Sequence, residues 1–216
     1  MCRYGTFKSK ELNNFKIIIT LLVITLMGCD REESQLELVF NKSELVTIEK
    51  IISYYDEFVV SNSEIKHPID IAYSEFLNER CQKAIMFNNL NFLLPENKGK
   101  FKFYDTLDSI TFKEIFNIRD SINYTNGVTI YSPYTLSINY NGKYMDLLEL
   151  LAQKNDFFNN YYQAIISTGD IGPYNYAVVL EEYDNLDFTK KEERLVLIIN
   201  LLHASILDYN FEENVP

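Results

Sequence analysis

The feature that most constrains the fold of this 216-residue chain is an apolar run near its C-terminal end, LVLIINLL at residues 195–202. In a helix these side chains cover every side, so the helix is stable only if other segments surround it. Eight residues are too few to cross a membrane, which takes about 20. Thr189 and Glu192 have the spacing of a capping box just before the run. The pattern therefore predicts a buried central helix that begins near Thr189.

Apolar residues recur at helical spacing in several further stretches. We expect helices over residues 44–60, 69–87, 111–119, 145–166 and 173–183. Ser43 is the expected N-cap of the first helix, and Thr111 opens the third with a capping box to Glu114. Gly169 is the expected C-cap of the helix over 145–166. Residues 88–104 contain Pro95 and Gly99 and are expected to form a loop.

One stretch has the alternation of a β-strand rather than the spacing of a helix. Residues 128–131 are rich in β-formers, and Leu136, Ile138 and Tyr140 alternate with polar residues. Asn141-Gly142 follows, which is a strong turn signal. The expected fold is therefore mainly α, with five or six helices in a single domain over residues 43–216 and a small β-hairpin insert near 128–145.

The N-terminal segment has the pattern of a secretory signal. Residues 1–16 carry four basic residues and one acid, and residues 17–27 are uncharged and almost wholly apolar. Eleven residues rise about 16 Å in a helix, roughly half of the hydrocarbon core of a bilayer. A basic start, a short apolar middle and a small residue, Gly28, at the end indicate a segment that directs export rather than one that spans the membrane.

The end of this segment, Leu26-Met27-Gly28-Cys29, resembles the lipobox of bacterial lipoproteins. The resemblance implies that the Cys29 thiol is alkylated with diacylglycerol and that the chain is cut between Gly28 and Cys29. It divides the chain into a signal peptide over 1–28, a lipidated polar tether over 29–42, and the domain. Two or three acyl chains hold a protein stably on a membrane, whereas one does so only marginally.

The acidic stretch after Cys29, Asp30-Arg31-Glu32-Glu33, bears on which membrane holds the protein. It resembles acidic tags that send some lipoproteins to the cell surface. An acid directly after the cysteine also resembles a signal that retains lipoproteins at the inner membrane. We expect the outer membrane or cell surface rather than the inner membrane.

The charge of the chain limits its partners. Residues 1–28 hold four of the 20 Lys and Arg and one of the 31 acids, so the mature chain keeps 16 and 30 and has a net charge of about −14. Nucleic acid binding needs basic patches, and none stands out. We expect the lipid to hold the protein to the membrane, and a protein of the envelope to be its partner. Cys81 is the remaining cysteine, expected to be buried.

The chemistry-bearing residues form no recognised catalytic motif, and no metal or cofactor is expected. His67 with Asp70 could make one acid–base pair, whereas His203 follows the apolar run and is expected to be a core residue. A group of acids, Glu181, Glu182, Asp184 and Asp187, could offer oxygen ligands to a cation, but a solvated surface is the expected use.

Aromatic residues are the candidate ligand surface. The tyrosines concerned are Tyr161, Tyr162, Tyr174, Tyr176 and Tyr183. Tyrosine rings bind sugars and peptides well, although the same spacing also fits core packing.

Three triplets, 105–107, 108–110 and 120–122, resemble the Asp-Ser/Thr-aliphatic acceptor of a bacterial O-glycosylation system. If they are modified, this segment is exposed to the periplasm or the outside.

Three functions remain open from the sequence. The first is an exported, membrane-anchored lipoprotein with a non-catalytic binding domain. The second is an immunity-type lipoprotein that neutralises a basic toxin, for which an acidic surface would speed capture. The third is an envelope hydrolase or glycan-binding protein, in which carboxylates would converge in a cleft.

Overall fold

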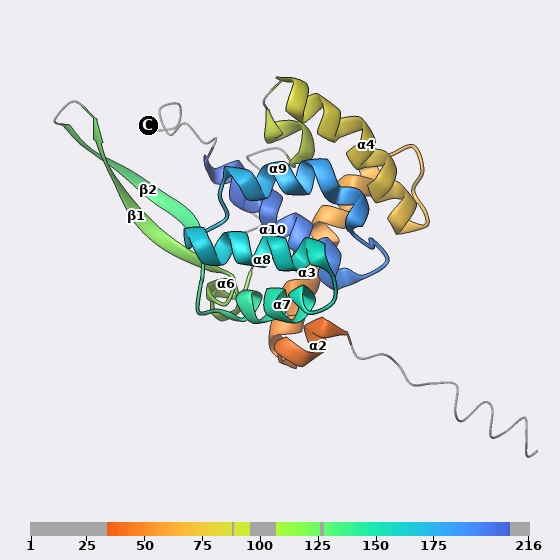
Figure 1. Cartoon of the computed structure of the whole chain (residues 1–216), viewed down its shortest axis with the longest axis horizontal. Helices are drawn as coiled ribbons and strands as arrows, with labels where there is room; N and C mark the ends of the chain where they lie inside the picture. Colours follow the sequence, from red (N-terminus) through yellow and green to blue (C-terminus); the bar gives the residue numbers. More distant parts are fainter. Residues whose placement is uncertain (1–33, 88, 96–106, 126–127, 208–216) are drawn as a thin grey trace, which may run out of the picture. The chain divides into compact units, whose positions relative to one another are not determined.

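The computed structural model describes residues 34–87, 89–95, 107–125 and 128–207. This part of the chain is mainly helical and contains one two-stranded antiparallel sheet, which confirms the predicted fold class (Figure 1). The signal segment, Cys29 and residues 30–33 lie outside the described residues.

The elements follow one another in a simple order. They are α2 (Gln35–Val39), α3 (Lys42–Ser61), α4 (Ile69–Phe87), η1 (Leu90–Leu93), α6 (Ser109–Lys113), β1 (Phe116–Thr125), β2 (Val128–Ile138), α7 (Lys143–Ala152), α8 (Asp156–Thr168), α9 (Pro173–Glu182), η2 (Tyr183–Asn185) and α10 (Lys191–Leu207). Helix α4 has the predicted bounds, and α9 confirms the helix expected after Gly172.

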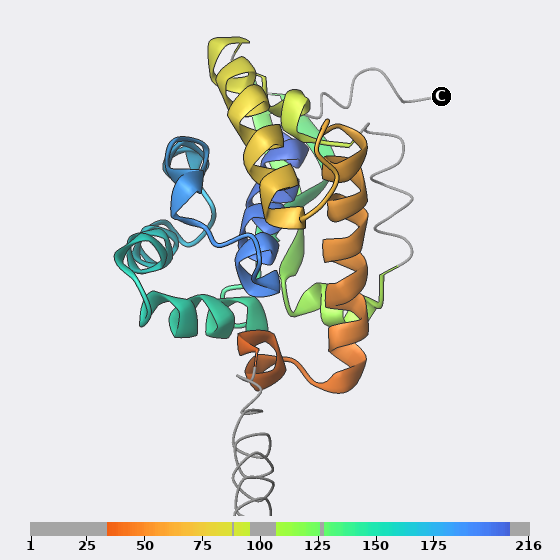
Figure 2. The same ribbon diagram turned by 90° about the vertical axis from the view of Figure 1, so that its right-hand side faces the viewer.

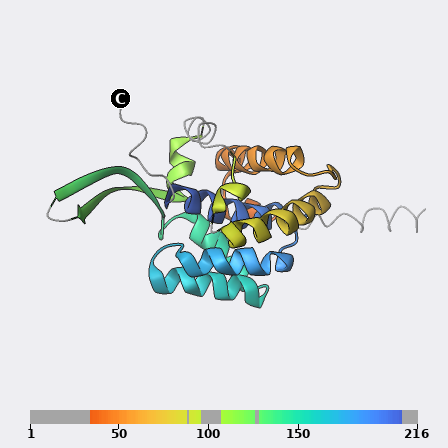
Figure 3. The same ribbon diagram turned by 90° about the horizontal axis from the view of Figure 1, so that it is seen from above.

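Helix α10 is the centre of the domain, as the apolar run predicts. It passes between the α8–α9 pair on one side and α3 on the other (Figures 2 and 3). Every residue from Glu192 to His203 is buried. The predicted capping box is wrong, because Thr189 donates to the Asp187 carboxylate and Glu192 accepts from Ser34. The helix begins at Lys191 instead.

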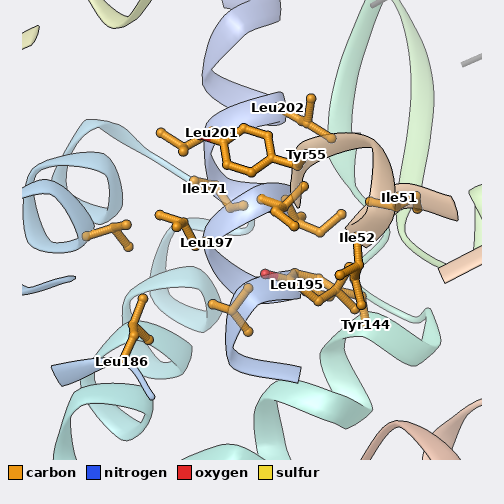
Figure 4. Packing of buried hydrophobic residues seen from close by; sticks show 14 of the residues in the cluster. Ile51, Ile52, Tyr55, Tyr144, Ile171, Leu186, Leu195, Leu197, Leu201 and Leu202 are labelled. Carbon is orange, nitrogen blue, oxygen red and sulfur yellow. The ribbon is translucent and has the colours of Figure 1, made fainter. Parts of the chain in front are cut away.

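The core forms where α10 meets the surrounding helices. Figure 4 shows Leu195 and Leu197 of α10 packed among side chains of α3, α7 and the α8–α9 loop. Fully burying one Leu or Ile side chain contributes roughly 1.5–3 kcal/mol, so this contact is the main source of stability. Tyr55 is fully buried as well, and its hydroxyl donates to the Leu93 carbonyl over 2.6 Å.

The compact unit begins at Ser34, so residues 34–42, which we expected to belong to a tether, are folded. Ser34 caps α2, and the Leu36 and Phe40 side chains are buried in the core. The predicted N-cap of α3, Ser43, is also wrong. Asn41 caps this helix in a capping box with Glu44, because its side chain accepts from the backbone N–H groups of Ser43 and Glu44.

The predicted helix over 111–119 is shorter and begins earlier. Asp108 caps α6 by accepting from the Thr111 N–H over 2.9 Å, and the helix ends at Lys113. Strand β1 then takes residues 116–119 because they pair with β2, from Phe116 opposite Ile138 onward. Sequence reasoning found β2 and missed β1, whose register has an irregularity between Arg119 and Ser121.

The hairpin turn was predicted at the wrong place. Asn141-Gly142 does not join two strands, because Gly142 is the N-cap of α7. The strands are instead joined between the paired residues Thr125 and Val128, and a second Asn-Gly pair occupies positions 126 and 127 of the sequence. At Gly142 the chain passes so close to the Glu114 backbone carbonyl that an added Cβ would overlap it.

The long helix expected over 145–166 is two helices. Helix α7 ends at Ala152, and Asn155 starts α8 by accepting from the Phe158 N–H over 2.9 Å. An Asn side chain that caps a new helix favours a break over a continuous helix. Gly169 ends α8 in the left-handed conformation at φ 76°, which confirms the predicted C-cap.

Gly142→Ala is expected to lower the free energy of unfolding by about 1–3 kcal/mol, because the new methyl group can be placed only by shifting the backbone. Gly172→Ala is the matched control. It lies at another helix N-cap, where the nearest atom to an added Cβ is the Asn175 side-chain oxygen at 3.9 Å. Urea unfolding followed by circular dichroism measures both. Equal losses in the two variants would contradict the close approach at Gly142.

Candidate functional site

The most distinctive polar feature of the interior is a chain of three side chains, Asp170, His203 and Tyr176. They come from the α8–α9 loop, α10 and α9. His203 Nε2 lies 3.1 Å from Asp170 Oδ1, and the Tyr176 hydroxyl lies 2.5 Å from His203 Nδ1. The His203 ring is only 2% exposed. The two ring nitrogens of His203 therefore face different partners, a phenol at Nδ1 and a carboxylate at Nε2.

Asp170 also accepts hydrogen bonds from two backbone N–H groups, one in its own loop and one at the end of β2. Its Oδ1 accepts from the N–H groups of Ile138, the last residue of β2, and of Ile171. Burial alone would raise the pKa of Asp170, but the close contact with His203 and the hydrogen bonds from these two amides outweigh it and lower the pKa below its usual value. The carboxylate therefore joins the base of the hairpin, the α8–α9 loop and α10.

A second buried polar group lies next to this one, around Tyr161. Asn200 of α10 donates to the Tyr161 hydroxyl over 3.0 Å, and Asn175 of α9 donates to the Tyr161 carbonyl over 3.3 Å. Burial raises the pKa of Tyr161 to about 12. Its ring is 1% exposed. Asn200 therefore joins α8 to the central helix, and Asn175 joins α9 to α8.

Two of the five tyrosines of the predicted aromatic ligand surface are buried. Tyr161 lies in the interior, and Tyr176 is only 8% exposed and directed at His203. Tyr162 and Tyr183 are partly buried against the core. The side chain of Tyr174 lies outside the described part. For Tyr161 and Tyr176 the helical spacing therefore reflects core packing, which was the alternative use of the same pattern.

The other predicted candidates do not converge either. His67 is exposed in the loop before α4, and within the described residues no hydrogen bond or ion pair joins it to Asp70. His203 is a core residue, as predicted. The acids from Glu181 to Asp187 are exposed, and Asp187 is paired with Lys190 at 3.3 Å. Across the described ranges, no group of three or more His, Cys, Asp or Glu side chains could hold a metal ion.

Sequence reasoning missed a buried charge cluster at the start of α10. Arg194 is buried, and its guanidinium donates to the Phe188 carbonyl over 2.6 Å and lies 3.2 Å from Asp56 of α3. The Tyr73 hydroxyl of α4 donates to the same carboxylate over 2.7 Å. Burial raises the pKa of Asp56 above its usual value, although Tyr73 and Arg194 oppose the shift. The sequence feature that could have indicated this cluster is the position of Arg194, a charged residue directly before a run that must be buried.

Cys81 is buried in α4, as predicted, and burial raises the pKa of its thiol to about 12. A thiol in this state is a poor nucleophile. Of the three glycosylation-like triplets, Asp108-Ser109-Ile110 is exposed at the start of α6. The triplet at 105–107 lies largely outside the described residues, and the side chains of the triplet at 120–122 lie outside them too.

The surface carries several large apolar side chains, which fall into two groups. Near α2 and the start of α3 these are Leu38, Val46, Ile110 and Tyr140, and along α4 and the loop before it they are Ile65, Ile71, Ile85, Met86 and Phe87. In the described part of the chain no helix has both the length and the apolar composition that a membrane crossing requires.

No model of a known family matches the chain, and no similar protein was found among curated sequences or solved structures. The geometry of the chain itself therefore carries the functional argument.

Asp170→Asn is expected to destabilise the domain at neutral pH. The lowered pKa means that the carboxylate contributes stability above the unfolded-state pKa near 4 and loses it as pH falls through the folded-state value. The difference in unfolding free energy between wild type and variant should therefore shrink from pH 7 towards pH 3. Glu149→Gln, an exposed position on α7, is the control and should show no such trend. A difference in unfolding free energy that stays constant with pH would refute the claim that the Asp170 carboxylate stabilises the folded state.

Proposed function

We propose that this protein is an exported lipoprotein, anchored in the bacterial envelope by lipid on Cys29, whose helical domain binds a protein partner without catalysing a reaction. The observation that carries the proposal is the order of features at the N-terminus, from the basic start through the short apolar run to Gly28 and Cys29. The outer membrane or cell surface is the favoured location.

The position at which the folded domain begins is compatible with a lipid anchor on Cys29. The compact unit begins at Ser34, five residues after Cys29, so the whole chain beyond a short link is available to fold outside the membrane. Helix α10, which contains the apolar run at 195–202, is used to build the core. A lipid on Cys29 is then the simplest attachment to a bilayer, and dual or triple acylation makes it stable.

A binding role is supported by how the chemistry-bearing residues are used. His203, Asp170 and Asp56 are engaged in contacts that join elements to one another. His67, which is exposed, has no described acid partner. His67 and Asp70, the acid–base pair on which a hydrolase could depend, are not joined by a hydrogen bond or ion pair in the described part of the chain.

The net charge favours one kind of protein partner. The mature chain carries about −14, and the acids of α9 and η2 lie at the surface. Opposite charge raises the rate of association and makes it sensitive to salt. We therefore propose as the second candidate function that the partner is a basic protein, such as a toxin that this lipoprotein neutralises.

Cys29→Ala is expected to abolish lipid attachment, because the side chain no longer has a thiol to alkylate. Wild type should float with membranes after a carbonate wash. The variant should lack the lipid-dependent increase in mass and lose the processed form cut before residue 29. Cys81→Ala, which removes the buried cysteine, serves as the control and should behave as wild type. Processing and flotation of Cys29→Ala equal to those of wild type would contradict the anchor.

A pull-down tests the partner. Detergent-extracted lipoprotein is immobilised and mixed with envelope lysate at several salt concentrations, and bound proteins are identified by mass spectrometry. A basic partner should be retained at low salt and lost as salt rises above the physiological range, where the screening length falls below about 8 Å. Glu181→Lys with Glu182→Lys should weaken retention more than Lys83→Glu, which changes a charge on α4. Retention of no stoichiometric protein would refute the binding role.

A further inference from the structure

The distance between the anchor and the folded domain is short enough to fix which face lies at the membrane. Ser34 is five positions after Cys29, and a fully extended chain spans at most about 3.6 Å per residue, so the link reaches no more than roughly 18 Å. Ser34 is itself held in place. Its side chain caps α2 and donates to the Glu192 carboxylate of α10 over 3.3 Å. This inference rests on the proposed lipid anchor.

The elements nearest to Ser34 form one end of the domain. Helices α2, α6 and α7 and the start of α3 lie together there, on the side away from α4 (Figures 1 and 2). Helix α3 has 20 residues and is therefore about 30 Å long, so its far end at Ser61 is much further from Ser34 than its start at Lys42. We call this the anchor end.

The anchor end carries aliphatic side chains that the core does not use. Leu38 on α2 is 54% exposed, Val46 on α3 is 57% exposed and Ile110 on α6 is 67% exposed. Leu38 follows Ser34 by one helical turn, and Val46 lies in the second turn of α3. Isolated exposed aliphatic side chains are common on protein surfaces. These three lie at the end nearest the proposed lipid anchor, where the bilayer offers an apolar region that can take them up.

Acids outnumber lysines at the anchor end, as they do in the whole chain. The acids of α2, α7, α6 with its N-cap and the first turns of α3 are Glu37, Glu44, Glu49, Asp108, Asp146 and Glu149, and the lysines of these elements are Lys42, Lys50, Lys113 and Lys143. Glu44 forms an ion pair with Lys143 at 2.6 Å, and Asp108 is used as the cap of α6. Two of these carboxylates are therefore engaged within the domain, and the proposed membrane contact rests on the exposed aliphatic side chains and the short link rather than on charge.

We propose that the anchor end is a membrane-contacting face, on which Leu38, Val46 and Ile110 enter the headgroup region of the leaflet that holds the Cys29 lipid. The domain is then oriented rather than freely tumbling. The end that carries Ile85 and Met86 at the C-terminal turn of α4 faces away from the bilayer, where a partner reaches it.

A depth measurement on the lipidated protein tests this. Single cysteines replace Val46 or Ile110 in a Cys81→Ala background, each is labelled with an environment-sensitive fluorophore, and the protein is reconstituted into phosphatidylethanolamine–phosphatidylglycerol vesicles. Ile85→Cys and Met86→Cys are the matched controls, since their side chains are 55% and 75% exposed. Nitroxide lipids should quench the labels at 46 and 110 at least about twofold more strongly than those at 85 and 86.

Flotation of the same samples separates the two proposals. Samples that float with the vesicles but show equal quenching at all four sites, or stronger quenching at 85 and 86, overturn the oriented face and leave the anchor standing. Samples that do not float overturn the anchor and the face together. Circular dichroism of each labelled variant confirms that the helical fold is retained.

Discussion

The complete burial of helix α10 is the constraint on which the rest of the structure depends. Every residue from Glu192 to His203 is removed from water, so the chain must supply neighbours on all sides of one helix. Helices α3 and α9, the base of β2, the η1 turn and the short α2 do so. This explains why a five-residue helix, α2, belongs to the domain, since Leu36 and Phe40 complete the core.

The polar residues of α10 then decide how those neighbours are arranged. Apolar contacts are not directional, whereas a buried polar group must meet a partner or cost roughly 1–3 kcal/mol. Arg194 meets Asp56 of α3, Asn200 meets Tyr161 of α8, and His203 meets Tyr176 of α9 and Asp170 beside the hairpin base. These three polar side chains of the central helix therefore hold α3, α8 and the α9–hairpin side against it.

The sequence predicted the features that arise from local patterns. The apolar run at 195–202 predicted the central helix, and the 3.6-residue spacing predicted α4 with its exact bounds. Strand β1 was missed because residues 116–119 become a strand by pairing with β2, which is a tertiary interaction. The aromatic spacing was ambiguous between surface and core, and packing against α10 decided it for Tyr161 and Tyr176. The Asp170–His203–Tyr176 chain joins residues far apart in sequence, so no local pattern pointed to it.

The functional account depends on where the mature chain begins, because the lipid anchor, the length of the link to Ser34 and the orientation of the domain all follow from it. The most direct test is the intact mass of the protein extracted from membranes of the cells that make it. The account predicts a chain that begins at Cys29 and carries the additional mass of a diacylglyceryl group, usually with an acyl group on the new amine. A chain that retains residues 1–28, or that begins elsewhere without lipid, would contradict it.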